Sequence, residues 1–158
     1  MGTKKRTASY DKLVPDVRYG SLLASKFIKC LMLDGKKATA ARVFYDAMDQ
    51  IQKRIPDADP IEVFKAAIEN VKPTLEVRSR RVGGANYQVP MQVRPHRQQS
   101  LSMRWLIGAV RSKTGRPMYL RLADELMAAA RREGEAMAKR EQTIKMAEAN
   151  KAFSHFAW

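Results

Sequence analysis

The chain has 158 residues, 45% of them hydrophobic, and carries 30 Lys and Arg against 16 Asp and Glu, a formal net charge of +14. A single domain of this length can bury a real core, but so large a charge raises self-repulsion and indicates a polyanionic partner such as RNA. No stretch approaches the roughly 20 consecutive apolar residues of a membrane-spanning helix, which excludes a membrane protein of that type.

The first twenty residues are basic and show no helical period. Their cations are Lys4, Lys5, Arg6, Lys12 and Arg18. Pro15 and Gly20 interrupt regular structure, so we predict a basic N-terminal arm over residues 1–20 that becomes ordered on its partner, and a helical RNA-binding body over residues 21–158. The polar start has no apolar core, unlike a secretory signal, which favours the cytoplasm.

Two amphipathic helices are predicted next. The first begins after Ser21 and stops at Gly35, and its apolar residues recur at helical spacing: Leu23, Phe27, Cys30 and Leu31. We therefore expect Cys30 to be an inert thiol in the core. The second runs from Ala40 to about Arg54 on the stripe Val43, Phe44, Ala47, Met48 and Ile51.

A third helix has a clear start signal. Asp59 suits the N-cap, Pro60 the first turn and Glu62 the third position of a capping box. The buried stripe would be Phe64, Ala67, Ile68 and Val71, and Pro73 ends the helix.

Between Leu75 and Val93 the apolar period falls to two, which predicts a β-hairpin at about residues 75–93. A two-residue turn at Gly83-Gly84 would set Val77 opposite Pro90. A three-residue loop that includes Ala85 would set Val77 opposite Met91 and would segregate apolar from basic side chains, so this second register is preferred.

Three further helices follow the hairpin. They run from Pro95 to about Gly115, from about Pro117 to Gly134, and from Glu135 to about Phe153. The middle helix has the most regular apolar stripe, with Tyr119, Leu122, Ala123, Leu126, Met127 and Ala130. The fold class is therefore mainly α: a single domain of about six helices, with a protruding two-stranded hairpin between helices three and four.

The central third of the chain is strongly one-sided in charge. No acidic residue lies between Glu76 and Asp124, whereas ten basic residues do. Three of these, Arg97, Arg104 and Arg111, recur every two helical turns and share one helix face about 10 Å apart. A solvated face is the alternative, but such faces usually interleave Glu with Arg, so the stripe favours binding to a phosphate backbone.

The predicted hairpin tip is also basic. Arg78, Arg80 and Arg81 precede the Gly83-Gly84 turn, and glycines allow a backbone to approach nucleic acid closely. A plain turn is the alternative interpretation.

Catalytic chemistry is not indicated. His96 and His155 are the only histidines and neither has a partner at metal-ligand spacing, so no metal or cofactor is expected. Residues 34–37, Asp-Gly-Lys-Lys, lack the glycine spacing of a nucleotide-binding loop. We predict that the protein is not an enzyme. The rival to an RNA-binding component is a free-standing basic regulator that binds duplex DNA, although neither a groove-reading helix nor a dimer seam is evident.

The chain resembles the family of small-subunit ribosomal protein seven. The likeness rests on residues 69–73 (Glu-Asn-Val-Lys-Pro), 76–84 (Glu-Val-Arg-Ser-Arg-Arg-Val-Gly-Gly), 87–90 (Tyr-Gln-Val-Pro) and 93–95 (Val-Arg-Pro). It extends to residues 34–37, 103–105, 121–126 and 146–155, and so covers essentially the whole chain. The N-terminal arm matches only loosely.

The resemblance implies a ribosome-bound cytoplasmic protein. It would be a primary binder of the 3′ major domain of small-subunit ribosomal RNA, nucleate head assembly, and contact exit-site transfer RNA near the messenger RNA path. Its protein neighbours would be small-subunit proteins nine and eleven. The implied ribosomal RNA residues are Lys4, Lys5, Arg6, Lys36, Lys37, Lys72, Arg94, Arg97, Arg104, Arg111, Lys113 and Arg116. The implied transfer RNA residues are Arg78, Arg80, Arg81, Gly83, Gly84, Lys139, Arg140, Lys145 and Lys151.

Overall fold

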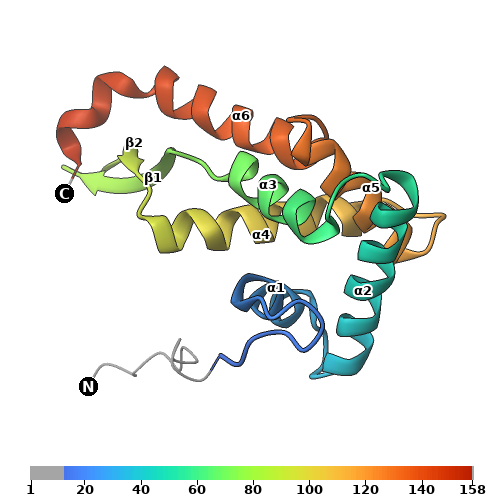
Figure 1. Cartoon of the computed structure of the whole chain (residues 1–158). Helices are drawn as coiled ribbons and strands as arrows, with labels where there is room; N and C mark the ends of the chain where they lie inside the picture. The colour runs from blue at the N-terminus through green and yellow to red at the C-terminus, as the bar shows by residue number, and fades with distance from the viewer. Residues whose placement is uncertain (1–12, 158) are drawn as a thin grey trace.

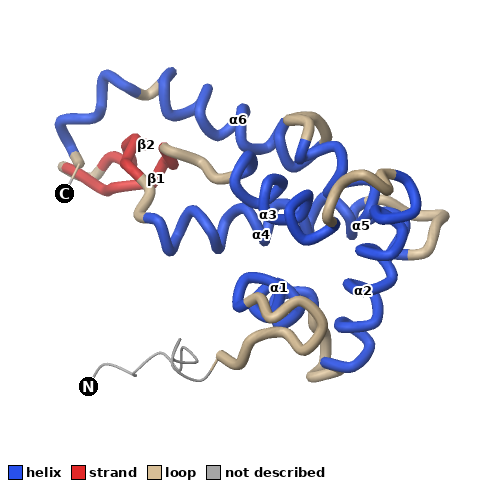
Figure 2. The backbone as a smooth tube through the Cα atoms, in the orientation of Figure 1, coloured by secondary structure: helices blue, strands red, loops and turns tan. Residues whose placement is uncertain are grey.

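The computed structural model describes residues 13–157 and is mainly helical. The elements in chain order are α1 (Leu22–Leu31), α2 (Lys37–Arg54), α3 (Pro60–Val71), β1 (Leu75–Val82), β2 (Ala85–Gln92), α4 (Pro95–Ser112), α5 (Met118–Ala130), α6 (Glu135–Ala149) and the 3-10 helix η2 (Lys151–Phe156). The antiparallel hairpin lies between α3 and α4, as predicted (Figures 1 and 2). None of the described helices is long and apolar enough to cross a membrane.

The core lies where α1 to α5 meet. Phe27, Phe44 and Phe64 are fully buried, and their ring centroids lie 5.2–5.8 Å apart in tilted or edge-on pairs. Such pairs stabilise a core beyond the burial of their area alone. Leu122 and Leu126 of α5 are also fully buried, so the predicted α5 stripe is confirmed as a core face.

Cys30 is exposed, and its predicted place in the core is wrong. The buried face of α1 is formed by Ala24, Phe27, Ile28 and Leu31. Cys30 lies at the margin of that face, toward the cations of Lys26 and Arg104. Partial burial nevertheless raises the pKa of the Cys30 thiol, so the thiol remains protonated at neutral pH.

The structure confirms the predicted N-cap of α3 but shows a different partner for the predicted capping-box glutamate. The Asp59 carboxylate accepts a hydrogen bond from the Ile61 backbone N–H at 3.1 Å, which confirms the predicted N-cap. Glu62, in contrast, forms an ion pair with Lys65 at 2.7 Å, one turn further along the exposed side of the helix.

Residues 13–20, the described part of the predicted arm, pack on α2. The buried Asp16 carboxylate accepts a hydrogen bond from the Tyr45 hydroxyl, and Arg18 forms an ion pair with Asp49. These residues therefore belong to the helical body, whereas the sequence predicted an extended arm as far as residue 20. Lys4, Lys5 and Arg6 lie outside the described residues.

The hairpin adopts the two-residue turn, so the preferred three-residue register is wrong. Val82 pairs with Ala85 and Val77 pairs with Pro90. Gly83 and Gly84 both have positive φ, +56° and +87°, and this type of two-residue turn matches the right-handed twist of the strands.

The observed register mixes apolar and basic side chains on one face. Arg78 lies opposite Val89, and Arg80 lies opposite Tyr87. The expected segregation of apolar from basic side chains fails because this face is not left to solvent: Tyr87 contacts the rings of Phe153 and Phe156 in η2. The arginines are compatible with this covered face because each finds an internal acceptor.

Replacing Gly83 or Gly84 by valine should disturb the hairpin tip and leave the helical body intact. A Cβ at either glycine meets no atom within 4 Å, so the cost arises from the positive φ alone. We expect thermal melting of the helices within a few degrees of the parent, together with faster amide exchange in β1 and β2. Gly108→Ala, in the interior of α4 and also unobstructed, is the matched control. Global unfolding of the valine variants would contradict this separation of tip and body.

Candidate nucleic-acid interface

The hairpin (β1 and β2) and the C-terminal segment (α6 and η2) form one structural unit, called here the arm. It is distinct from the N-terminal arm predicted over residues 1–20. The Tyr87 ring lies 5.4 Å from that of Phe153 and 4.9 Å from that of Phe156. The Arg80 guanidinium donates a hydrogen bond to the Phe156 carbonyl oxygen. Figure 1 shows α6 running above the hairpin before the chain turns down onto it. The hairpin is therefore brought together with the end of the chain that carries Lys151, whereas Lys139 lines a cavity beside Arg104 of α4 and Arg140 lies at the end of α3.

The three arginines near the hairpin tip have different environments. Arg78 forms an ion pair with the buried Glu76 at 2.6 Å, and Arg80 is bound to the C-terminal segment. Arg81 lies on the opposite face, paired with Asn86, and is exposed. Arg81 is thus the tip cation best placed to meet an external phosphate.

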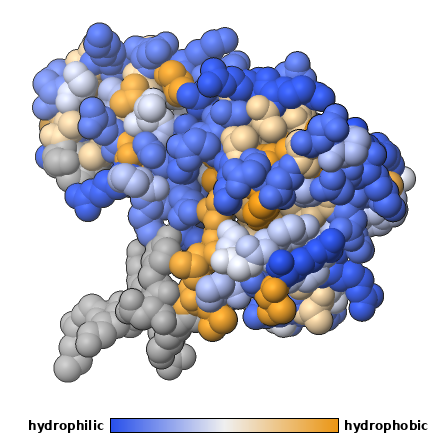
Figure 3. Space-filling view, in the orientation of Figure 1, coloured by the Kyte–Doolittle hydropathy of each residue, from blue (hydrophilic) through white to orange (hydrophobic). Residues whose placement is uncertain are grey.

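The cations of the C-terminal segment also divide into two groups. Lys139, Lys145 and Lys151 are exposed. Arg140 instead donates from Nε to the Lys72 carbonyl oxygen at 3.1 Å, and so ties α6 to the end of α3. Lys72 itself forms an ion pair with Glu69. The upper part of the molecule, where α6 runs, is dominated by hydrophilic side chains (Figure 3).

The predicted arginine stripe is present along α4, but two of its members have internal partners. Arg97 forms an ion pair with Glu76 at 3.2 Å, and Arg111 donates to the Leu31 carbonyl oxygen, at the end of α1, at 3.1 Å. Arg104 is exposed and forms no ion pair with any described residue. It is therefore the member most available to RNA.

Lys113 and Arg116 hold the α4–α5 connection to the body. Lys113 pairs with the buried Glu125 at 2.8 Å, and this hydrogen bond raises the pKa of the Lys113 ammonium. Arg116 pairs with Asp124 at 2.9 Å. The basic segment is therefore partly neutralised within the fold, because Glu76, Asp124 and Glu125, the carboxylates at its two ends in the sequence, form ion pairs with its cations.

Sequence reasoning missed the cations of α1. The Lys26 ammonium donates to the Gln99 side chain at 2.9 Å, which brings α1 beside the arginine stripe of α4. Lys29 follows one turn later and is half-buried. We name this the α1–α4 surface: Lys26, Lys29, Arg97, Arg104 and Arg111. The three-residue spacing of the two lysines was the only sequence signal.

The remaining predicted ribosomal RNA residues among those described lie at helix starts. Lys36 and Lys37 are exposed at the start of α2, and Arg94 is exposed immediately before α4. Among residues 13–157 no group of three or more His, Cys, Asp or Glu side chains could hold a metal ion.

The chain is similar to ribosomal proteins over nearly its whole length. Residues 3–151 match the family described as Ribosomal protein S7p/S5e. The small ribosomal subunit protein uS7 of Rhodopirellula baltica is 65% identical over 96% of this chain and 98% of its own length. The proteins of the same name from Magnetococcus marinus and Nitratiruptor sp. are each 54% identical, over 99% and 98% of this chain and 99% of their own length. The chain belongs to the ribosomal protein S7p/S5e family, a family of structural, non-enzymatic proteins of the small ribosomal subunit.

Proposed function

We propose that this protein is a primary binder of the 3′ major domain of small-subunit ribosomal RNA and nucleates assembly of the subunit head. The arm then contacts exit-site transfer RNA near the messenger RNA path. The neighbouring proteins are small-subunit proteins nine and eleven. The observation that carries the proposal is the presence of exposed basic residues both on the α1–α4 surface and on the arm; the two sets meet at the body, where Lys139 and Arg104 line one cavity.

The α1–α4 surface suits ribosomal RNA. Arg104 is exposed at its centre without a carboxylate partner among the described residues, and Lys26 lies beside it on α1. Two packed helices hold these cations on a rigid base, so little side-chain and backbone order must be gained on binding. Fixed cations along a phosphate backbone contribute affinity through release of condensed counterions.

The arm suits a second RNA. Its exposed cations, Arg81, Lys139, Lys145 and Lys151, lie on the hairpin and the C-terminal segment. Aromatic contacts join these two parts, so the hairpin and the last helix would approach a ligand together. In Figure 1 the hairpin projects from the start of α4 at the end of the molecule away from α2, so its tip lies beyond the helical body.

Replacing Arg97, Arg104 and Arg111 together by glutamine should weaken the salt dependence of binding to a 3′ major domain transcript. If all three neutralise phosphates, the slope of log K against log salt should fall by roughly two to three, at about 0.7–0.9 per phosphate. Arg104→Gln alone should lower this slope by about 0.7–0.9, as expected for one phosphate. Binding would be titrated at several salt concentrations. Lys65→Ala, a paired surface cation of α3, is the control, and an unchanged slope in the triple variant would contradict an RNA role for the stripe.

Co-sedimentation distinguishes this function from a free-standing regulator that binds duplex DNA. The full chain should sediment with small ribosomal subunits from a native lysate. Recovery in the free fraction, together with preference for duplex DNA over the transcript, would favour the regulator.

A further inference from the structure

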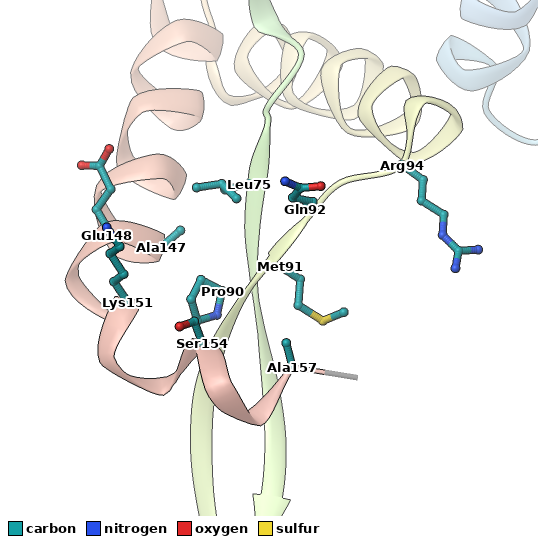
Figure 4. Close-up of a pocket in the computed structure, with 10 residues that line it drawn as sticks. All are labelled: Leu75, Pro90, Met91, Gln92, Arg94, Ala147, Glu148, Lys151, Ser154 and Ala157. Atoms are coloured by element: carbon teal, nitrogen blue, oxygen red, sulfur yellow. The ribbon is translucent and has the colours of Figure 1, made fainter.

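Two adjoining cavities open at the base of the hairpin. The larger, of about 790 Å³, lies between β2 and the C-terminal segment. Leu75 and Pro90 form its apolar side and face Ala147 of α6 and Ser154 of η2, whereas Met91 points to the other side of β2 (Figure 4). Its size is within the roughly 300–1,000 Å³ of sites that hold small molecules.

The faces of η2 explain why this cavity stays open. A 3-10 helix has three residues per turn, so residues three apart share a face. Phe153 and Phe156 use one face to stack on Tyr87. Lys151 and Ser154, with Ala157 just beyond the helix, use another face to line the cavity. The aromatic contacts thus hold η2 away from Pro90 instead of letting it close on the strand.

The smaller cavity, of about 280 Å³, is lined by three arginines, Arg78, Arg94 and Arg97. Glu76 lies at its base and binds Arg78 at 2.6 Å and Arg97 at 3.2 Å. One carboxylate therefore orients two guanidinium groups and leaves a net positive charge. Such preoriented guanidinium groups match the oxygens of a phosphate.

The two cavities are neighbours, because Met91, Gln92 and Arg94 line both. Figure 4 places Arg94 on the α4 side of the larger cavity, with Glu148 and Lys151 on the opposite side. The apolar cavity thus adjoins the cationic cavity along β2 and the residues that lead into α4.

We propose that the paired cavities bind one unpaired, extruded ribonucleotide, with its base against Leu75 and Pro90 and its phosphate at Arg94. This inference rests on the proposed RNA-binding function and names a site within it. Protein recognition of RNA commonly uses bases that leave the stack in loops and bulges. A base provides a flat apolar face for the larger cavity, and the Gln92 amide can both donate to and accept from its edge.

The charges favour this occupant over an apolar protein segment. An apolar segment would leave Arg94 without a counter-ion, whereas a nucleotide provides the anion next to the apolar group. A base held within an RNA duplex would not enter, because it remains stacked and paired.

Filling the larger cavity tests the inference. Ser154→Trp places a large side chain in the cavity without changing any charge, and Ala152→Trp places the same side chain on the exposed outer face of η2. Affinity for the 3′ major domain transcript should fall about three- to tenfold for Ser154→Trp, because the base can no longer be buried against Leu75 and Pro90. Ala152→Trp should bind within about twofold of the parent.

Arg94→Gln tests the phosphate half of the site. It should lower the salt slope by about 0.7–0.9, as expected for one phosphate. Parent-like binding by Ser154→Trp would overturn the inference and leave the cavity to a protein partner. Equal weakening by Ser154→Trp and Ala152→Trp would overturn it as well, because the effect would not depend on the cavity. If the parent itself does not bind the transcript, the proposed function fails, and this site fails with it.

Discussion

Glu125→Ala is expected to lower the free energy of unfolding by about 2–4 kcal/mol, because two hydrogen bonds to a buried carboxylate are lost and a cavity remains. For a chain of this size the melting temperature should fall by roughly 5–15 °C. The Glu125 side chain is only 1% exposed. One oxygen accepts from the Ala136 backbone N–H at 2.9 Å, and the other accepts from the Lys113 ammonium at 2.8 Å.

Through these contacts Glu125 of α5 is bonded to both α4 and α6. Its hydrogen bond to Ala136 satisfies a donor in the first turn of α6, and its ion pair with Lys113 holds the end of α4. Gly134 stands so close that a Cβ there would lie 2.8 Å from the Glu125 carboxylate oxygen, and its φ is +94°. Gly134 is therefore required both for the turn and for the space.

Thermal melts of three variants separate these contributions. Glu125→Gln keeps an acceptor for Ala136 and loses the ion pair, so it should be less destabilised than Glu125→Ala. Glu141→Ala, an exposed acid of α6, is the control and should melt with the parent. Because the pKa of Lys113 is raised above 10.5, the stabilisation that its ammonium provides should be present at neutral pH and be lost as the pH rises beyond that value. A parent-like melt of Glu125→Ala would contradict the role of Glu125 in holding α4, α5 and α6 together.

Deleting residues 78–88, with a short linker in their place, should separate the two RNA-binding roles. The α1–α4 surface is retained, and loss of the cavity at the hairpin base accounts for no more than about tenfold, so affinity for the 3′ major domain transcript should stay within that limit, or 1.4 kcal/mol. Exit-site transfer RNA retention or reading-frame fidelity should change on assembled ribosomes, because the tip cation Arg81 is removed. Both quantities would be measured on the same variant.

The deletion also removes Tyr87 and Arg80, the hairpin partners of the C-terminal segment. Tyr87→Ala is therefore the matched control: it loosens η2 but keeps the hairpin tip. If Tyr87→Ala reproduces the full effect on transfer RNA, the C-terminal segment rather than the tip makes the contact. A large loss of ribosomal RNA binding with normal transfer RNA behaviour would reverse the assignment of roles.

The helices were predictable because their signals are local. An apolar stripe at helical spacing, a cap such as Asp59 and a break such as Gly134 act within a few residues of one another. The stripe of α5 accordingly matched its buried face. The prediction for Cys30 failed because this residue lies at the margin of such a stripe. Whether it is buried then depends on how the neighbouring helices pack.

The hairpin register failed for a related reason. The expected segregation of apolar from basic side chains assumed that one face of the hairpin would be solvated, but Phe153 and Phe156, some 70 residues away in sequence, cover the face of Tyr87. Two glycines of positive φ then set the turn. No local pattern shows that a distant segment will return to a strand.

The sequence by itself determined the helical class, the place of the hairpin and the excess of positive charge, because periodicity, turn residues and charge are properties of neighbouring residues. Only the tertiary structure decided which cations remain available. Arg97, Lys113 and Arg116 meet the carboxylates of Glu76, Glu125 and Asp124, whereas Arg104 meets none among the described residues. Ion pairs form between side chains that folding brings within a few ångströms, and that proximity depends on how the helices pack rather than on composition.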